Sequence, residues 1–426
     1  MKISALNESG QPVDWWFMYK VPQLGKGAGN DAATGYEYVY YDSKIDGDPD
    51  PRNRNVTKSP FVINSGKGAL NETLESVFKN FKNPPKSTGW ILYNDEMPES
   101  TNRKDDGSKG HTKGVIAYDT DSKTAYWLLH SWPKFIDPGA AEDPTPKYGQ
   151  TYLCLSLDLA TASKIAEQML HHQEPQVYYS HTPADLPLTD PLYLLTQPLD
   201  PKPQGDGDTI NLKTIGNMPF SVIAKNKEWN KDFWNDLVGP TLKDDMDDET
   251  WIRGPIPPMA DSDGIHKTFD IKYVNLGFMG AHWAWPETHD HAKWGVTIHE
   301  QYVCIGDINR MISQRKRGGG TIAFQNKILW QGLSKAGLVL APPGHSRDEA
   351  HDVIAKTHHR HNEAPPKAAV TAAPKKAVSK KAAPAKAAPK KAAPKKAVAP
   401  KKAAAPEKAT APKKAAAPKK AAPKKK

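Results

Sequence analysis

The feature that most constrains how this chain can fold is a short pattern that occurs twice, 180 positions apart. Each copy begins with a His-x-Lys pair, which is His111 with Lys113 in the first and His291 with Lys293 in the second. Each pair is followed by two apolar runs typical of strands and then by a polar turn. This repeat predicts an internal duplication with two equivalent lobes, at 1–190 and 205–345, joined by a crossover rich in Pro, Asp and Gly.

Apolar patterns within the two lobes predict a mixed α/β fold. Alternating or continuous apolar runs bounded by Gly, Pro and Asp indicate strands, and apolar residues at helical spacing indicate helices between them. Asp158 is placed to cap one of these helices. The predicted strands are 36–41, 90–93, 115–118, 125–129, 177–179, 221–224, 295–298 and 302–305, and the predicted helices are 70–81, 159–170 and 321–333.

The composition changes abruptly near Ala364. From there to Lys426 the sequence consists almost entirely of Ala, Pro and Lys, with 20 Lys and one Glu. Frequent Pro prevents helix formation and nothing is available to build a core, which predicts a disordered tail at 364–426. The composition of this segment resembles the tails of linker histones.

The charge is divided unequally between the predicted folded part and the tail. The whole chain has a net charge of +10, but the tail alone carries +19, and residues 1–363 carry 38 basic and 47 acidic residues, or −9. A folded part that repels phosphate and a tail that attracts it predict nucleic-acid binding through the tail, with strong salt dependence. All 15 His precede the tail, so a falling pH would make the folded part more positive and favour its encounter with DNA.

The two His-x-Lys pairs have the chemistry that phosphodiester cleavage requires. Residues two apart in a strand point to the same face, so each pair presents an imidazole beside an ammonium group. A neutral His can attack phosphorus, a protonated His can donate to the leaving oxygen, and two Lys can neutralise the remaining phosphate oxygens. One pair alone is weak evidence, but two pairs in matching contexts predict one phosphodiesterase site that needs no metal and no other cofactor.

Further stretches of the chain resemble the deoxyribonuclease II family, in the order in which that family has them. The resemblance extends from about Ser9 to Leu340, and the family is a branch of the phospholipase D superfamily. It implies a pseudo-twofold pair of phospholipase D-like lobes, with mixed β-sheets flanked by helices and one active site at their seam. The matching stretches are 9–15, 19–22, 92–95, 110–114, 129–131, 148–151, 290–294, 304–310 and 317–321.

Carried over position by position, the resemblance implies a role for each residue of the two pairs. His111 would be the nucleophile, which forms a phosphohistidine, His291 would be the general acid, and Lys113 and Lys293 would hold the phosphate. The family implies metal-independent, acid-favoured cleavage of double-stranded DNA by an endonuclease that leaves 3′-phosphate ends. The positions that would orient the imidazoles or touch phosphate are His130, Ser131, Asp307 and Asn309.

The sequence departs from the family pattern in two respects. The superfamily has an acid five residues after the Lys, where this chain has Tyr118 and Ile298, so another residue such as Asp307 must orient the imidazole. Secreted members have several disulfides, whereas Cys154 and Cys304 are the only cysteines here and are expected to be unpaired and buried. Together with the lack of a signal-peptide core, this predicts a cytoplasmic protein.

Three alternatives differ from a metal-independent nuclease in substrate or chemistry. A phospholipid-directed phosphodiesterase could use the same two His, but the acidic folded part and the lack of a long apolar run argue against a membrane partner. A histone-like protein that compacts DNA would not need intact His and Lys pairs. A metal-dependent nuclease would need clustered carboxylates at the spacing of metal ligands, which the sequence lacks.

Two further expectations concern assembly and local structure. A homodimer that grips a duplex would fit the expected function. The Gly-rich run at 317–321 is expected to open a helix whose amides could hold a phosphate, and Trp15, Trp16, Trp90, Trp127 and Trp132 are expected in the core.

Overall fold

The computed structural model describes residues 2–26, 30–138, 147–199, 202, 205–251 and 265–339. The chain divides into two compact units, Met1–Pro366 and Lys367–Lys426, and every described residue belongs to the first. The tail predicted at 364–426 lies outside the described residues. Both predicted lobes lie within the first unit, so their boundaries remain predictions.

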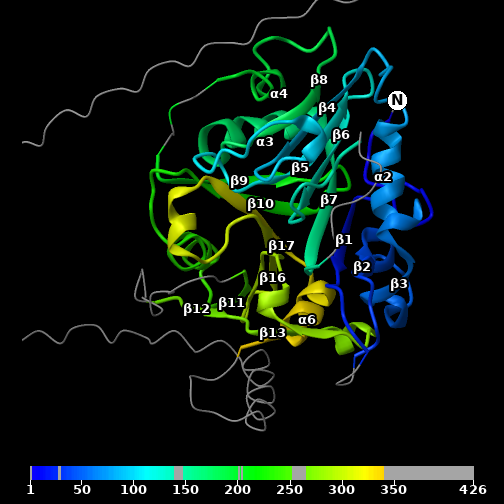
Figure 1. Cartoon of the computed structure of the whole chain (residues 1–426), viewed down its shortest axis with the longest axis vertical. Helices are drawn as coiled ribbons and strands as arrows, with labels where there is room; N and C mark the ends of the chain where they lie inside the picture. Colours follow the sequence, from blue (N-terminus) through cyan, green and yellow to red (C-terminus); the bar gives the residue numbers. More distant parts are fainter. Residues whose placement is uncertain are drawn as a thin grey trace, which may run out of the picture. The chain divides into compact units, whose positions relative to one another are not determined.

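An eight-stranded antiparallel sheet forms the N-terminal half of the described unit (Figure 1). Every neighbouring pair in this sheet runs antiparallel, so the expected mixture of strand directions does not occur in it. In sheet order the strands are β3 (Thr57–Val62), β2 (Glu37–Asp42), β1 (Trp15–Lys20), β7 (Gln150–Asp158), β6 (Thr124–His130), β5 (Lys113–Asp119), β4 (Thr88–Asn94) and β8 (Val177–His181).

A seven-stranded sheet forms the C-terminal half, and it contains one parallel pair, β11 with β12. In sheet order its strands are β12 (Thr268–Asp270), β11 (Met246–Glu249), β15 (Trp294–Thr297), β16 (Tyr302–Gly306), β17 (Gly319–Gln325), β10 (Pro219–Lys225) and β9 (Gly207–Lys213). A small third sheet has the order β14 (Ala284–Pro286), β13 (Tyr273–Asn275) and β18 (Gly337–Leu338).

The strands that follow the two His-x-Lys pairs have the same neighbours in the two large sheets. In the first sheet the antiparallel order is β4, β5, β6, β7, β1, and in the second it is β11, β15, β16, β17, β10. The Lys113 pair leads into β5 and the Lys293 pair leads into β15, which occupy the same place in these two orders. The two halves therefore share a strand arrangement around the repeated pattern, whereas the outer strands differ.

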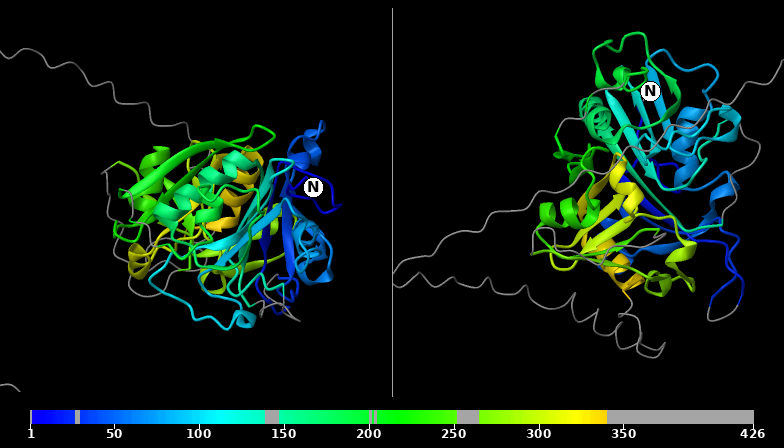
Figure 2. Two further views of the ribbon diagram at one scale, coloured as in Figure 1. Left: turned by 90° about the horizontal axis from the view of Figure 1, so that it is seen from above. Right: turned by 60° about the vertical axis from the view of Figure 1, so that its left-hand side comes forward.

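Helices cover the sheets on more than one side (Figures 1 and 2). Helix α2 (Ala69–Phe78) packs on one face of the first sheet, where its Leu70 and Leu74 join Trp16 and Met18. Helices α3 (Leu159–Gln168) and α6 (Lys327–Ala336) belong to a larger core that includes residues of both sheets. The shorter helices are α1 (Ser43–Asp46), α4 (Pro191–Leu194) and α5 (Gly239–Leu242), with 3₁₀ turns at Pro51–Asn53, Ile63–Ser65, Glu99–Thr101, Leu276–Met279, Glu287–His289 and Ile312–Lys316, and π turns at η4 (Met169–Gln173) and η5 (Trp234–Val238).

Alternation along the strands divides the core into its layers. Trp15, Phe17 and Tyr19 of β1 enter the core shared by the two sheets, while the residues between them face α2. This period of two is expected for a strand that is covered on both faces. The five tryptophans expected in the core are all buried, as are Cys154 and Cys304, which are both free thiols.

All eight strands predicted from the sequence are present, and two of the three predicted helices are also confirmed. The Asp158 side chain caps α3 by accepting a hydrogen bond from Thr161 N at 2.7 Å. The helix predicted at 321–333 is wrong, because its first part is strand β17, paired with β10 and β16. Asn326 ends that strand, and its side chain accepts a hydrogen bond from Leu329 N as it caps α6. The Gly-rich run at 317–321 therefore leads into a strand and not, as expected, into a helix.

Ten strands of the described residues were not among those predicted: β1, β3, β7, β9, β11, β12, β13, β14, β17 and β18. Strands β1 and β7 are apolar without regular alternation, because both of their faces are buried. Within the part of the chain that the structure describes, no helix is both long and apolar enough to cross a membrane.

Gly110, which directly precedes His111, fits tightly against the end of the η4 turn. Its N–H donates to Glu174 O at 2.9 Å, and a Cβ at this position would overlap the Gln173 carbonyl oxygen. Because the obstacle is main chain, it cannot be relieved by a change of rotamer.

We expect Gly110→Ala to lower the free energy of unfolding by about 1–3 kcal/mol, as overpacking does. The measurement is the midpoint of chemical denaturation. Gly107→Ala is the matched control, because a Cβ at Gly107 would meet nothing within 4 Å. Equal stability of the two variants would show that the η4 turn yields and does not fix the loop before His111.

Candidate active site

The eight residues predicted for the site all lie at strand ends where the two sheets meet. In the first sheet, His111 and Lys113 lie at the start of β5, and His130 and Ser131 lie at the end of β6. In the second sheet, the corresponding pairs precede β15 and follow β16. All eight are buried: His111, Lys113, His130, Ser131, His291, Lys293, Asp307 and Asn309. Neither of the two His predicted to be catalytic lies inside a strand, contrary to expectation, because β5 begins at Lys113 and β15 begins after Lys293.

Each predicted catalytic His is held by a main-chain hydrogen bond to the opposite half. His111 N donates to Gly318 O at 2.9 Å, and His291 N donates to Gly149 O at 2.9 Å. Gly149 directly precedes β7 and Gly318 directly precedes β17, which occupy the same place in their sheets. The two bonds are therefore reciprocal, and they fix both imidazoles at the seam independently of their side-chain contacts.

The His111 ring is oriented by a main-chain carbonyl. Its Nδ1 lies 2.5 Å from Asp307 O, so Nδ1 carries the proton and donates it, which leaves a lone pair on Nε2. Burial lowers the pKa of His111 well below its ordinary value, and the charges of Lys113 and Lys293 lower it further, although Asp95 opposes them. Asp307 thus orients the imidazole as expected, but through its carbonyl and not through its carboxylate.

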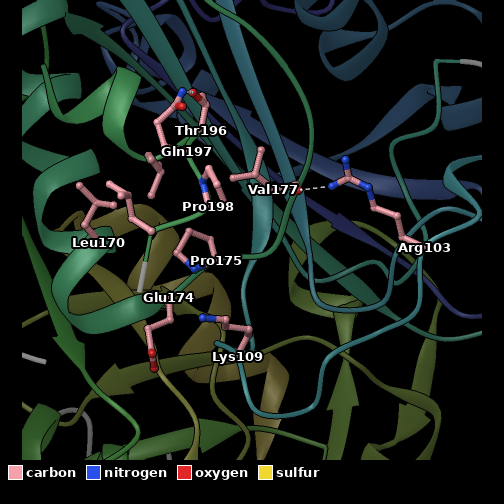
Figure 3. A pocket seen from close by; sticks show the side chains of 11 residues that line it. Arg103, Lys109, Leu170, Glu174, Pro175, Val177, Thr196, Gln197 and Pro198 are labelled. Carbon is pink, nitrogen blue, oxygen red and sulfur yellow. Dashed lines mark hydrogen bonds between the residues drawn. The ribbon is translucent and has the colours of Figure 1, made fainter. Parts of the chain in front are cut away.

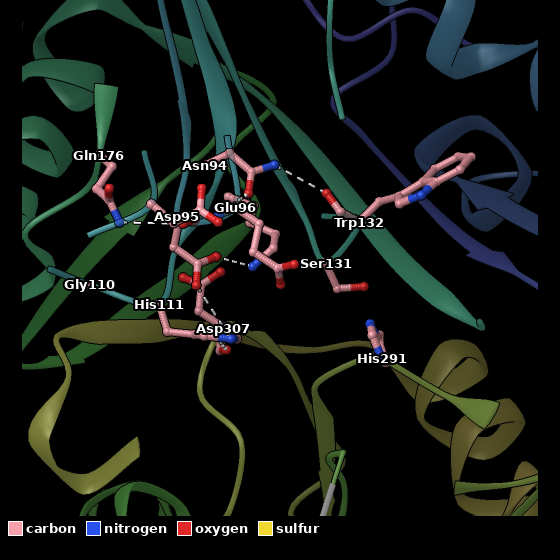
Figure 4. A network of polar contacts seen from close by, with 12 residues as sticks. Asn94, Asp95, Glu96, Gly110, His111, Ser131, Trp132, Gln176, His291 and Asp307 are labelled. Atoms are coloured by element: carbon pink, nitrogen blue, oxygen red, sulfur yellow. Dashed lines mark hydrogen bonds and ion pairs between the residues drawn. The ribbon is translucent and has the colours of Figure 1, made fainter. Parts of the chain in front are cut away.

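Asp95, which directly follows β4, contacts the cations of the site. Its Oδ1 accepts a hydrogen bond from Lys113 Nζ, and its Oδ2 lies 3.0 Å from Arg317 Nη1 and 3.7 Å from His111 Nε2. Figure 4 shows Asp95, His111 and Asp307 close together, with His291 approaching from the other side below Ser131.

His291 packs against two aromatic rings. The Tyr148 ring is nearly parallel to the imidazole, with centroids 4.0 Å apart and an interplanar angle of 8°, and the Trp251 ring is tilted with a centroid distance of 3.8 Å. The main chain of both aromatic residues is held, because Lys20 Nζ donates to Tyr148 O at 2.6 Å and Trp251 N donates to Asn309 Oδ1 at 3.2 Å. Electron-rich ring faces favour the protonated form of an imidazole packed against them.

Asp290 anchors the segment that carries His291. Its Oδ2 accepts hydrogen bonds from Tyr19 at 2.5 Å and from Trp285 at 2.7 Å, and its Oδ1 accepts one from Ala292 N at 2.8 Å. Tyr19 belongs to β1, so this carboxyl group joins the two halves. Burial raises the pKa of Asp290, although these hydrogen bonds oppose the shift.

Burial shifts the pKa of two more groups at the seam. It lowers the pKa of Lys293 to about 7, and the nearby charge of Lys113 acts in the same direction. The Lys293 ammonium donates to His291 O at 2.5 Å. Burial also raises the pKa of Asp307 well above its ordinary value, so that this carboxyl group is largely neutral in acid. Acidification therefore makes the site more positive.

The remaining supporting residues act at a greater distance from the two His. Burial lowers the pKa of His130 to about 3, so it is neutral, and its Nδ1 accepts a hydrogen bond from Trp132 N at 3.2 Å. Ser131 Oγ lies 2.5 Å from the Gln150 side-chain amide and accepts a bond from Thr151 N at 3.1 Å. Asn309 positions Trp251, as described above.

Four residues of the site were not singled out from the sequence: Asp95, Tyr148, Trp251 and Arg317. Three of them stand inside stretches that resemble the family, at 92–95, 148–151 and 317–321, so these stretches contained the signal. Trp251 lies outside every such stretch, and nothing in the sequence pointed to it.

A cavity of about 400 Å³ lies near the loop that precedes His111 (Figure 3). Arg103, Lys109 and Glu174 line it together with apolar side chains such as Leu170 and Pro175. None of the eight predicted site residues is among the residues that line it. Glu174 is paired there with Lys227, at 2.8 Å.

Comparisons with known proteins agree with the sequence resemblance. The family model described as Deoxyribonuclease II matches residues 4–340. A Burkholderia thailandensis protein that carries the provisional name deoxyribonuclease-2 is 58% identical over 358 residues, covering 84% of this chain and 99% of that protein. Deoxyribonuclease-2 of Caenorhabditis elegans is 32% identical over 78% of this chain and 92% of its own, and deoxyribonuclease-2-alpha of Rattus norvegicus is 30% identical over 77% and 91%.

We expect Tyr148→Leu to lower kcat for phosphodiester cleavage by about 2- to 10-fold, which corresponds to the 0.5–1.5 kcal/mol of one aromatic pair. The pH at which activity is half-maximal should also decrease, because the protonated imidazole loses a ring face. Kinetics over a range of pH measure both effects. Tyr148→Phe retains the ring and should resemble the unchanged protein; an equal loss in both variants would assign the effect to the hydroxyl group.

Proposed function

We propose that this chain, which belongs to the deoxyribonuclease II family and is an endodeoxyribonuclease, hydrolyses double-stranded DNA without a metal ion through a phosphohistidine on His111. Both His-x-Lys pairs reach the same seam between the sheets, and this is the observation that supports the proposal most strongly. The two imidazoles differ in environment, which suits one to attack and the other to proton transfer.

In the first step, the lone pair of His111 Nε2 attacks the phosphorus and the bond to the 5′ oxygen breaks. The Asp307 carbonyl accepts a hydrogen bond from Nδ1–H and supports the positive charge that develops on the ring. Protonated His291 gives its proton to the leaving oxygen, so a 5′-hydroxyl end departs and the 3′ strand stays bonded to His111 through phosphorus. Lys113 and Lys293 face the charge that develops on the phosphate oxygens.

In the second step, neutral His291 takes a proton from water, which attacks phosphorus and breaks the bond to His111 Nε2. The product is a 3′-phosphate end, and both imidazoles return to their starting protonation states. Two buried cations, Lys113 and Lys293, and the half-buried Arg317 supply the positive charge that other nucleases obtain from metal ions.

Acid pH favours this reaction because of the direction of the pKa shifts. Lys293, with a pKa lowered to about 7, is charged below that pH and loses its charge above it, so its attraction for phosphate declines as the pH rises through 7. The largely neutral Asp307 carboxyl group adds no negative charge in acid.

We also propose that the two halves are phospholipase D-like lobes related by a pseudo-twofold axis through the site. The common strand order around β5 and β15 supports this relation, as do the reciprocal hydrogen bonds of His111 and His291. The homodimer and the cytoplasmic location expected from the sequence remain predictions.

The alternatives raised by the sequence are less well supported. The family and the names of the relatives refer to deoxyribonucleases, which favours DNA over a phospholipid as the substrate. A purely DNA-compacting role would not require Nε2 of His111 to carry a lone pair, or two aromatic rings packed against His291.

The decisive test is plasmid cleavage at about pH 5 in excess chelator. We expect cleavage by the unchanged protein and a loss of at least about 10³-fold in His111→Ala and in His291→Ala, because each removes a group that bonds to or protonates the substrate. His282→Ala is the matched control, because this His is exposed. Cleavage that requires an added metal ion would refute the mechanism.

The covalent step has its own readout. DNA labelled on the 3′-phosphate side of the cut should become attached to the unchanged protein when turnover is stopped by denaturation in alkali, but not to His111→Ala. Attachment to His291 instead would exchange the two roles.

For the Lys-rich tail, we expect replacement of its Lys by Gln to weaken duplex binding at neutral pH and to flatten its salt dependence. Each phosphate contact that is lost should reduce the slope of log K against log salt by about 0.9. Fluorescence anisotropy at several salt concentrations measures this. An unchanged slope would remove the tail from DNA binding.

A further inference from the structure

The phosphate-binding cations of the site already contact an anion, which is a side chain of this protein. Asp95 bonds to Lys113 through one carboxylate oxygen and to Arg317 Nη1, at 3.0 Å, through the other. The second oxygen also lies 3.7 Å from His111 Nε2, the atom proposed to attack phosphorus. The group is buried, with a side chain that is 4% exposed.

This arrangement has the geometry of a bound phosphate. Carboxylate and phosphate groups are recognised alike, by an Arg fork and a Lys ammonium that bond to separate oxygens. A substrate poised for attack needs its phosphorus about 3–3.5 Å from the nucleophile. The Asp95 carboxylate therefore occupies the volume that a scissile phosphate would need.

Arg317 is fixed so that one donor remains for an anion at this position. Its Nε donates to Lys109 O at 2.9 Å and its Nη2 donates to Gly110 O at 2.8 Å, which leaves Nη1 directed at Asp95. The guanidinium group thus holds the loop before His111 and at the same time presents a cation to the site.

We propose that Asp95 stands in for the scissile phosphate in the resting enzyme, and that DNA displaces its carboxylate, which takes up a proton, and binds to Lys113 and Arg317 in its place. The inference rests on the proposed function, because it concerns the phosphate of that reaction. It assigns Arg317 as a third phosphate-binding cation. It also assigns Asp95 as a group of the protein that competes with the substrate phosphate for Lys113 and Arg317.

The proton is needed because the phosphate takes Lys113 and Arg317, the two cations that the Asp95 carboxylate contacts. The main chain beside it is held, since Asn94 Nδ2 donates to Phe135 O at 2.7 Å and Gln176 Nε2 donates to Asp95 O at 3.5 Å, so only the side chain turns. The charged and titratable groups that face Asp95 from the surrounding elements are His111, Lys113, His130, Lys293, Asp307 and Arg317. Two of the three cations in this set would be taken by the phosphate.

The direction of the pKa shift of Asp95 agrees with this exchange. Burial by itself raises the pKa of Asp95, but the charges of His111, Lys113 and Arg317 outweigh burial and hold it below its ordinary value. A phosphate that takes over Lys113 and Arg317 removes this support, so the pKa of Asp95 rises on binding. Binding is then coupled to proton uptake and weakens as the pH increases.

Sulfate binding to the full chain tests the exchange without DNA, because sulfate keeps its charge across the pH range. Calorimetry at pH 5 and pH 7.5, each in two buffers of different ionisation heat, gives affinity and proton uptake. We expect the unchanged protein to take up protons and to lose about tenfold in affinity per pH unit where the uptake approaches one proton. Asp95→Asn should bind sulfate at pH 7.5 at least about tenfold more tightly and with less proton uptake.

Three further variants locate the effect. Arg317→Gln, added to Asp95→Asn, should abolish the gain in sulfate affinity, because it removes the third cation. Arg315→Gln should not, since Arg315 lies near Asp232 at 3.9 Å and not near Asp95. Asp106→Asn is the matched carboxylate control, because Asp106 lies nearby on the surface.

Two results would overturn the inference. Sulfate binding to the unchanged protein without proton uptake is the first, and this measurement stands even if Asp95→Asn does not fold. The second is a folded Asp95→Asn that binds sulfate no more tightly than the unchanged protein, which would make Asp95 a positioning residue for Lys113. A protein that shows the exchange but cuts no DNA would refute the proposed nuclease and leave the sulfate-binding inference intact.

Discussion

The active site depends on the contact between two sheets along one seam, where the catalytic loops of each half are tied to the other half. His111 and His291 each donate a main-chain hydrogen bond to a glycine carbonyl that directly precedes a central strand of the opposite sheet. Tyr19 adds a side-chain bond from β1 to Asp290. Because these bonds cross between the halves, neither imidazole can be placed correctly unless both sheets have formed and packed.

Burial of charge at this seam explains most of the chemical properties of the site. Water is excluded from Lys113, Lys293 and Asp307, so burial shifts the pKa of Lys293 downward and that of Asp307 upward. Buried cations without counter-ions are costly, and Asp95 compensates two of them in the resting state. In the proposed exchange a substrate phosphate replaces that carboxylate, so the interaction that stabilises the resting site also competes with the substrate.

Patterns in the sequence predict much of the local structure, but they fail where tertiary contacts decide the secondary structure. Alternation and apolar runs predict eight of the strands, and Asp158 is correctly predicted as a helix cap. Strands β1 and β7 were missed because both faces are covered, which removes the alternation that identifies a strand. The spacing of apolar residues predicts one helix over 321–333, because the end of β17 and the helix after Asn326 are both apolar at compatible spacing.

By itself the sequence determined the chemistry that is available: two His-x-Lys pairs in repeated contexts, a polar turn after each, and a basic tail separate from an acidic folded part. These features are local, so spacing and composition suffice to find them. Only the tertiary structure decided which partners those groups acquire. The bond from His111 to the Asp307 carbonyl, the rings around His291, and Asp95 between Lys113 and Arg317 join residues far apart in sequence. Such contacts arise from packing two sheets together, and no local pattern records them.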